Sequence, residues 1–157
     1  MKIRVVDFDK LTRHYINYRE GVNKINTEKD NFLQEIEPIR KEMNSIIASM
    51  SSGLVLDNKS QEEKAIQFRT LQQELLSKEQ DFKFKLKGWT DELNEKCYDE
   101  LSEIITKWSI ENSIDLVTGK MEVVFCNKDF ESTDDILNIL KEKDLFFEEE
   151  VIEEKED

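Results

Sequence analysis

Two aspartates near the N-terminus, Asp7 and Asp9, follow the apolar residues 5–6 and are separated by one residue. Some phosphatases use this spacing to place one carboxylate as a nucleophile and a second as a general acid over Mg²⁺. That chemistry also needs a surrounding sheet of alternating strands and helices with Lys and further acidic ligands, and the sequence does not predict one. We therefore interpret Asp7 and Asp9 as residues at the end of a strand and the start of a helix.

The other reactive side chains are sparse. His14 is the only histidine, and no Ser or Cys stands in a recognisable nucleophile motif that it could serve. Cys97 falls in a helical apolar seam and Cys126 at the end of an expected strand, where cysteine behaves as a small hydrophobic residue. Their spacing predicts neither a disulfide framework nor a metal site. We expect a protein that is not an enzyme and uses no metal or cofactor.

Composition favours long helices over a compact enzyme fold. Of the 157 residues, 38% are charged, and there are only one Pro and four Gly. The 23 Lys+Arg against 36 Asp+Glu give a net charge of -13, which disfavours nucleic acid and anionic membranes as partners. Lysines alternate with apolar residues over 82–89, which could indicate a basic patch for nucleic acid. On a helix, however, a period of two distributes these side chains around the axis, so they cannot form one continuous strip.

No apolar stretch approaches the length that crosses a bilayer, so we expect no direct membrane insertion. The first residues have a basic start but lack the apolar core and cleavage site of a signal peptide. These features predict a cytoplasmic protein, with a virion-associated protein as the alternative.

Helical periodicity covers most of the chain. Apolar residues recur at spacings of four and three from Leu11 to Met50, and a second series runs from Phe68 to Trp108. This seam is typical of a left-handed coiled coil. Residues 51–60 collect Ser, Gly, Asp and Asn and predict the tip of a hairpin, with Ser60 as the N-cap of the return helix. Pro38 should bend or break the outgoing helix.

The two ends of the chain predict short strands. Residues 3–8 favour a first strand, and 114–118 with 121–125 read as an antiparallel hairpin turning at residues 119–120. Ser132 or Thr133 should then begin a short amphipathic helix. Residues 144–157 hold eight acids and one Lys, a composition typical of disorder. The apolar residues within them could nevertheless dock on another surface: Leu145, Phe146, Phe147, Val151 and Ile152.

Two segments together resemble the Skp/OmpH family of jellyfish-shaped, trimeric chaperones. Residues 2–11 resemble the family's first strand and its run into the long helix, and residues 114–140 resemble its Asp-Leu-Val strand, next strand and closing helix. The carrying positions include Asp115, Thr133 and Asp134. The resemblance implies a β-rich body formed by three subunits, with helical arms that hold unfolded clients without nucleotide.

The predicted fold is mainly α with a small β part: a long antiparallel helical hairpin projects from a small β body that oligomerisation completes. The body comprises residues 1–10 and 114–143, the hairpin arm residues 11–113 with its tip near 51–60, and the acidic tail residues 144–157. Three short strands make a poor independent sheet, so we expect sister subunits to complete it. The residues predicted to make these subunit contacts are Ile3, Val5, Leu116, Val117, Val123, Phe125, Ile136 and Leu140.

The predicted function is that of an ATP-independent holdase or assembly factor, a homotrimer that binds non-native or partly assembled proteins. Apolar residues toward the tip are the candidates for client binding, because Met and Leu repack around different partners. They are Ile46, Met50, Leu54, Val55 and Phe68. Apolar residues outside the seam, such as Leu76, Phe84, Tyr98 and Ile105, either face clients or pack on a neighbour. The alternative function is a structural or scaffolding coiled-coil protein of a phage particle or another large assembly.

Overall fold

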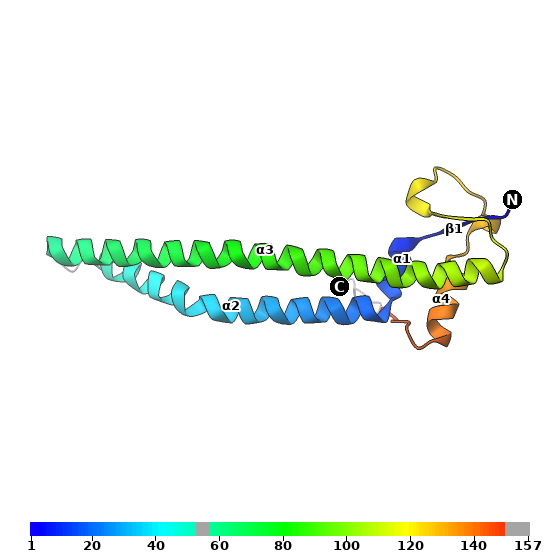
Figure 1. Cartoon of the computed structure of the whole chain (residues 1–157). Coiled ribbons are helices and arrows are strands. Elements are labelled where there is room, and N and C mark those ends of the chain that lie inside the picture. The colour runs from blue at the N-terminus through cyan, green and yellow to red at the C-terminus, as the bar shows by residue number, and fades with distance from the viewer. Residues whose placement is uncertain (53–56, 150–157) are drawn as a thin grey trace, which may run out of the picture. The chain divides into compact units, whose positions relative to one another are not determined.

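A computed structural model of the chain describes residues 1–52 and 57–149 (Figure 1). The elements are β1 (Ile3–Val6), α1 (Phe8–His14), α2 (Ile16–Ser51), α3 (Asn58–Glu111), β2 (Leu116–Gly119) and α4 (Thr133–Glu142). The chain divides into a body unit, Met1–Asn23 with Asp91–Asp157, and an arm unit, Lys24–Thr90. Both long helices contribute to both units. None of the helices in the described ranges is long and apolar enough to cross a membrane.

The arm unit is an antiparallel pair made of the second part of α2 and the first part of α3. Contacting residues run in opposite directions along the two helices: Phe32 stacks on Phe82 at 4.1 Å, and Gln67 donates a hydrogen bond to Glu42. The predicted seam is on the inside, with Ile36 and Ile39 buried. The mainly α fold with a long helical hairpin and a small strand part is therefore confirmed.

Pro38 lies inside α2 without ending it. Proline lacks the N–H that would bond the carbonyl of Gln34, so the helix loses one internal hydrogen bond there. Figure 1 shows that α2 changes direction in its cyan part, while it remains helical from Ile16 to Ser51. Of the two outcomes predicted for Pro38, the bend is the one observed.

The return helix begins three residues earlier than a Ser60 cap would place it. Asp57 precedes α3, and its Oδ1 accepts a hydrogen bond from the backbone N–H of Ser60 at 2.8 Å. This bond lowers the pKa of the Asp57 carboxyl. The prediction of Ser60 as N-cap was wrong because Asp57 caps the helix three residues upstream, and this places Ser60 inside the first turn.

The body unit contains a parallel two-stranded sheet. Ile3 is paired with Leu116 and Val6 with Gly119, so β1 and β2 run in the same direction. Residues 120–122 form a short 3-10 helix, and residues 123–125 form no strand. The predicted antiparallel hairpin was wrong because β2 pairs with β1 instead of with the segment that follows it.

One hydrophobic core lies inside the body unit. Its buried members come from both ends of the chain and from α3: Val6, Leu11, Tyr15, Cys97, Leu101, Ile105, Ile136, Leu137 and Leu140. Ile136 and Leu140 are fully buried, and Val5 is 3% exposed, so these side chains are already covered by their own chain. Assigning these three to the subunit interface was therefore wrong: the α4 face packs inward because Leu11 and Leu101 supply its apolar partners.

Helix α4 begins where the sequence predicted, but its N-terminus is held by other means. The Ser132 side chain makes no capping bond, whereas its backbone N–H donates to Val5 O at 2.9 Å. The Thr133 hydroxyl accepts a hydrogen bond from Asp7 N at 2.8 Å. The start of α4 is thus tied to the end of β1.

The outgoing helix is broken at Tyr15, which separates α1 from α2. Tyr15 is extended, with φ -83° and ψ 120°, and it forms an antiparallel bridge with Phe146. The periodicity that begins at Leu11 includes Tyr15 and predicted one continuous helix through it, and this was wrong. The first part of the predicted tail, residues 145–147, occupies the break, and residues 150–157 lie outside the described ranges.

Candidate interaction surfaces

Large apolar side chains of the arm unit face solvent although the two helices pair along their other faces. Among the described residues they are Leu33 at 53% exposure, Ile47 at 48%, Met50 at 48%, Ile66 at 62%, Leu76 at 54% and Phe84 at 81%. They are spread singly along both helices instead of forming one block. Such dispersed contacts suit partners of variable sequence better than one partner of fixed shape.

A shallow groove of about 390 Å³ crosses the paired helices of the arm unit. It is lined by Met43 on α2 and by Gln72, Gln73, Leu75, Leu76 and Glu79 on α3. The lining combines a flexible thioether, two leucines and uncharged amides, so an apolar segment can lie there without stranding a charge. Glu79 at the rim is paired with Arg40 at 3.4 Å.

The predicted client-binding residues fall into three groups. Met50 is exposed, and Phe68 is half-buried between the helices. Ile46 is only 6% exposed, so its assignment to client binding was wrong: it packs inside the hairpin as a seam residue. Leu54 and Val55 lie outside the described residues.

Of the residues set apart from the seam, Leu76 and Phe84 are exposed, whereas Ile105 is buried in the body core. The sequence analysis did not single out Leu33, Ile47 or Ile66. Their signal was available, because each is an apolar residue one or two positions off the four-three series.

Ion pairs hold the flanks of the arm unit together. Lys78 Nζ lies 2.7 Å from Glu35 Oε1, across the two helices. The hydrogen bond from Lys78 lowers the pKa of the Glu35 carboxyl. Exposed ion pairs of this kind add little stability, but they neutralise charged side chains of one helix with those of the other.

The body unit has an apolar groove beside β1. It has a volume of about 290 Å³ and is lined by Ile3, Val5, Thr118, Val123, Phe125, Cys126, Asn127 and Phe130. Phe125 is 80% exposed, and its neighbour Val124 is fully exposed. Four residues predicted for subunit contacts, Ile3, Val5, Val123 and Phe125, are thus brought to one groove. Of these, Val5 forms the floor.

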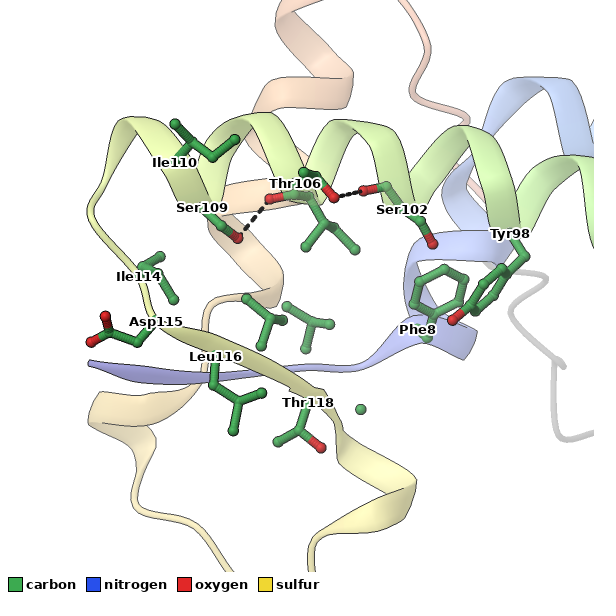
Figure 2. A pocket seen from close by; sticks show the side chains of 14 residues that line it. Phe8, Tyr98, Ser102, Thr106, Ser109, Ile110, Ile114, Asp115, Leu116 and Thr118 are labelled. Carbon is green, nitrogen blue, oxygen red and sulfur yellow. Dashed lines mark hydrogen bonds between the residues drawn. The ribbon is translucent and has the colours of Figure 1, made fainter. Parts of the chain in front are cut away.

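A second groove of about 370 Å³ lies between α3 and β2 (Figure 2). Two predicted subunit contacts line it, Leu116 at 49% exposure and the half-buried Val117. On the helix side, the Thr106 and Ser109 hydroxyls donate to carbonyls of their own helix, at 2.7 Å each. The protons of these two hydroxyls are therefore used within α3.

The residues considered for catalysis have structural roles. Asp7 caps α1 through a 3.0 Å hydrogen bond from Lys10 N, and Asp9 lies in the first turn of that helix. The described residues contain no cluster of three or more His, Cys, Asp or Glu side chains that could hold a metal ion. Cys97 is buried in the core, which raises the pKa of its thiol, whereas Cys126 is half-buried beside Phe125.

Comparison with known proteins identifies the family. Residues 2–140 match the OmpH-like outer membrane protein family. The chain belongs to the OmpH-like family. The resemblance seen in residues 2–11 and 114–140 is thereby confirmed.

A solved OmpH-like structure has the same fold as this family member. It is a candidate outer membrane chaperone from Caulobacter crescentus CB15, with a TM-score of 0.75 and 11% sequence identity. The match covers 90% of this chain and 85% of that one. A search of the curated proteins finds no match to this chain. At such low identity the OmpH-like structure establishes the fold, and the site residues must be argued from this chain itself.

Proposed function

We propose that this chain is an ATP-independent holdase that binds non-native polypeptides through the exposed apolar side chains of its arm unit. The observation that carries the proposal is the set of solvent-facing apolar residues dispersed along α2 and α3, with Phe84 the most exposed of them. Membership of the OmpH-like family and the chaperone description of the Caulobacter crescentus protein support it.

The proposed binding step is the burial of client hydrocarbon against these side chains. Each CH₂ removed from water contributes about 0.8 kcal/mol, so several weak contacts along one segment suffice to delay aggregation. Polar partners of fixed geometry are not needed. The groove at Met43 and Leu76 offers such contacts without a positioned charge at its centre.

The test is suppression of aggregation of two unrelated chemically denatured proteins, measured by light scattering in the absence of ATP. The Leu76→Ser, Phe84→Ser variant should lose most of the suppression, because it removes an exposed leucine that lines the groove and the most exposed large apolar side chain among the described residues of the arm unit. Met121→Ser is the matched control, since Met121 is 86% exposed but belongs to the body unit and lines neither of its grooves. A parent chain that fails to protect either protein, or binds one folded partner stoichiometrically instead, would contradict the holdase and favour a structural role.

We further propose that three copies assemble through the body unit. The grooves containing Phe125 and Leu116 leave apolar surface uncovered on one copy, and burial against sister copies would remove it from water. Phe125→Glu should lower the mass measured by light scattering to that of a smaller species, because a carboxylate cannot be buried there unpaired. Phe84→Ser should leave the mass unchanged. An unchanged mass for Phe125→Glu would contradict this interface.

A further inference from the structure

The segment that follows α4 is bound to its own chain like a short peptide ligand. We call residues 145–147 the strap. Ile16 N donates to Leu145 O at 2.9 Å, and Phe147 N donates to His14 O at 2.6 Å. These two bonds flank the antiparallel bridge between Tyr15 and Phe146. The strap therefore pairs with the one extended residue, Tyr15, and with backbone groups of its two helical neighbours, in the way a short strand is added to a sheet edge.

We call residues 14–19 together with Lys141 the seat. Side chains of the seat contact the two aromatic rings of the strap. The His14 imidazole stacks on the Phe146 ring with a centroid distance of 5.0 Å and an interplanar angle of 7°. Lys141 Nζ lies 4.7 Å from the centroid of the same ring, and Arg19 Cζ lies 5.0 Å from that of Phe147. A cation placed over the face of an aromatic ring is attracted by the electrons of that ring. The two cations therefore favour aromatic residues at both positions of the strap.

His14 makes a further polar contact with the strap. Its Nδ1 lies 2.9 Å from the carbonyl oxygen of Phe147, so the ring that stacks on one residue bonds the backbone of the next. The seat therefore recognises backbone and aromatic groups together. Glu148 and Glu149 follow the strap in sequence, and a basic seat suits a segment with acids at that end.

The extended edge exists because the outgoing helix is broken. In a continuous helix Ile16 N would bond the carbonyl of Thr12, but Tyr15 N uses that carbonyl and Ile16 N bonds the strap instead. The strap thus satisfies a donor that the break would otherwise leave free. The seat and its occupant depend on each other.

The strap reaches its seat through the end of α4. Asp144 has φ 55°, its N–H donates to Lys141 O, and Leu145 N donates to Leu140 O at 2.8 Å. This left-handed ending reverses the chain and aims residues 145–147 back at Tyr15. The occupant is therefore tethered by one short turn.

We propose that His14–Arg19 together with Lys141 form a binding site for a short extended peptide with two adjacent aromatic residues and trailing acids, and that the strap is its tethered occupant. The site goes beyond holding unfolded clients, since it reads a defined sequence chemistry. A free peptide competes with the tethered one, so the strap lowers the apparent affinity of the site for outside ligands.

The test uses the full chain and a fluorescently labelled peptide Leu-Phe-Phe-Glu-Glu, with binding measured by anisotropy. In the Phe146→Ser, Phe147→Ser variant the strap loses both rings, and the peptide should bind at least ten-fold more tightly than to the parent. The Phe84→Ser variant leaves the strap and its binding residues unchanged and is the control, expected to bind within about three-fold of the parent. The peptide Leu-Ser-Ser-Glu-Glu should bind none of them.

If the double variant loses the helical circular dichroism of the parent, Phe146→Leu replaces it in the test. Leucine keeps the apolar packing of this position but loses the stacking on His14. This single variant should bind the peptide at least three-fold more tightly than the parent. A folded variant that binds no better than the parent overturns the proposal. Equal affinity for the two peptides also overturns it.

Discussion

The hydroxyl of Tyr15 donates a hydrogen bond of 2.5 Å to Glu100 Oε2, although the two residues are 85 positions apart. Asn17 Nδ2 donates to both partners, at 3.0 Å and 3.2 Å. Tyr15 is 2% exposed and stands at the point where α1 ends and the strap is bound. One side chain thus ties the helix break to α3 through a polar contact at the edge of the core.

Tyr15→Phe removes this contact and should lower the free energy of unfolding by roughly 1–3 kcal/mol, since a hydrogen bond to a charged group is lost. Burial, followed by the hydrogen bond and charge of Glu100, raises the pKa of Tyr15 above its usual value near 10. Above about pH 10 the unfolded chain releases a proton that the folded chain retains, so Tyr15 costs stability as pH rises further.

Chemical denaturation from pH 8 to pH 11 measures both effects. The parent should lose more stability than Tyr15→Phe between pH 10 and pH 11. Tyr98→Phe serves as the control, because Tyr98 is 58% exposed and should change stability by less than about 0.5 kcal/mol. Parallel pH curves for the parent and Tyr15→Phe would show that this ionisation is not coupled to folding.

Two helical glycines should respond in opposite directions to the same substitution. At Gly88 an added Cβ would have no described residue within 4 Å beyond the neighbouring backbone of its own helix, so Gly88→Ala should stabilise the chain by about 0.5–1 kcal/mol through helix propensity. At Gly21 the added Cβ would lie 2.2 Å from Leu93 Cδ1. Overpacking costs about 1–3 kcal/mol, so Gly21→Ala should be destabilising on balance. Thermal unfolding of the two variants side by side checks the sign; equal shifts would show that Leu93 moves aside freely.

Asp144→Gly should stabilise the chain by up to about 1 kcal/mol. Asp144 holds a left-handed conformation after α4, where glycine carries no Cβ penalty. Asp135→Gly is the control, since Asp135 lies in the first turn of α4 and its loss should destabilise the helix by about 1 kcal/mol. The melting temperatures of both variants test this prediction. A loss of stability in Asp144→Gly would show that the left-handed conformation of Asp144 carries no energetic cost.

Pro38→Ala should straighten and stiffen α2. The new N–H can bond the carbonyl of Gln34, so hydrogen exchange over residues 34–38 should slow and stability should rise by about 1–3 kcal/mol. Glu37→Ala changes the adjacent exposed position without touching the backbone bond and should leave exchange nearly unchanged. Identical exchange in the parent and Pro38→Ala would mean that Pro38 does not create a flexible joint.

The long helical hairpin and its apolar seam could be predicted from the sequence, because helix periodicity is a property of residues a few positions apart. The start of α4 at Thr133 was predicted too, although the Ser132 side chain makes no capping bond. The sequence also supported the family, since the strand and closing-helix residues at both ends carry the resemblance. The exposed arm residues Leu76 and Phe84 were visible in the same pattern as positions off the seam.

The contacts made by the two ends of the chain depend on the tertiary structure. β2 pairs with β1 more than a hundred positions away instead of with its neighbour, α4 buries Ile136 and Leu140 within its own chain, and the strap breaks a helix that its local pattern would continue. In each case a backbone or apolar group finds its partner in a distant part of the chain instead of in its neighbours. Which partner it finds depends on the whole fold, so the local residue pattern cannot predict it.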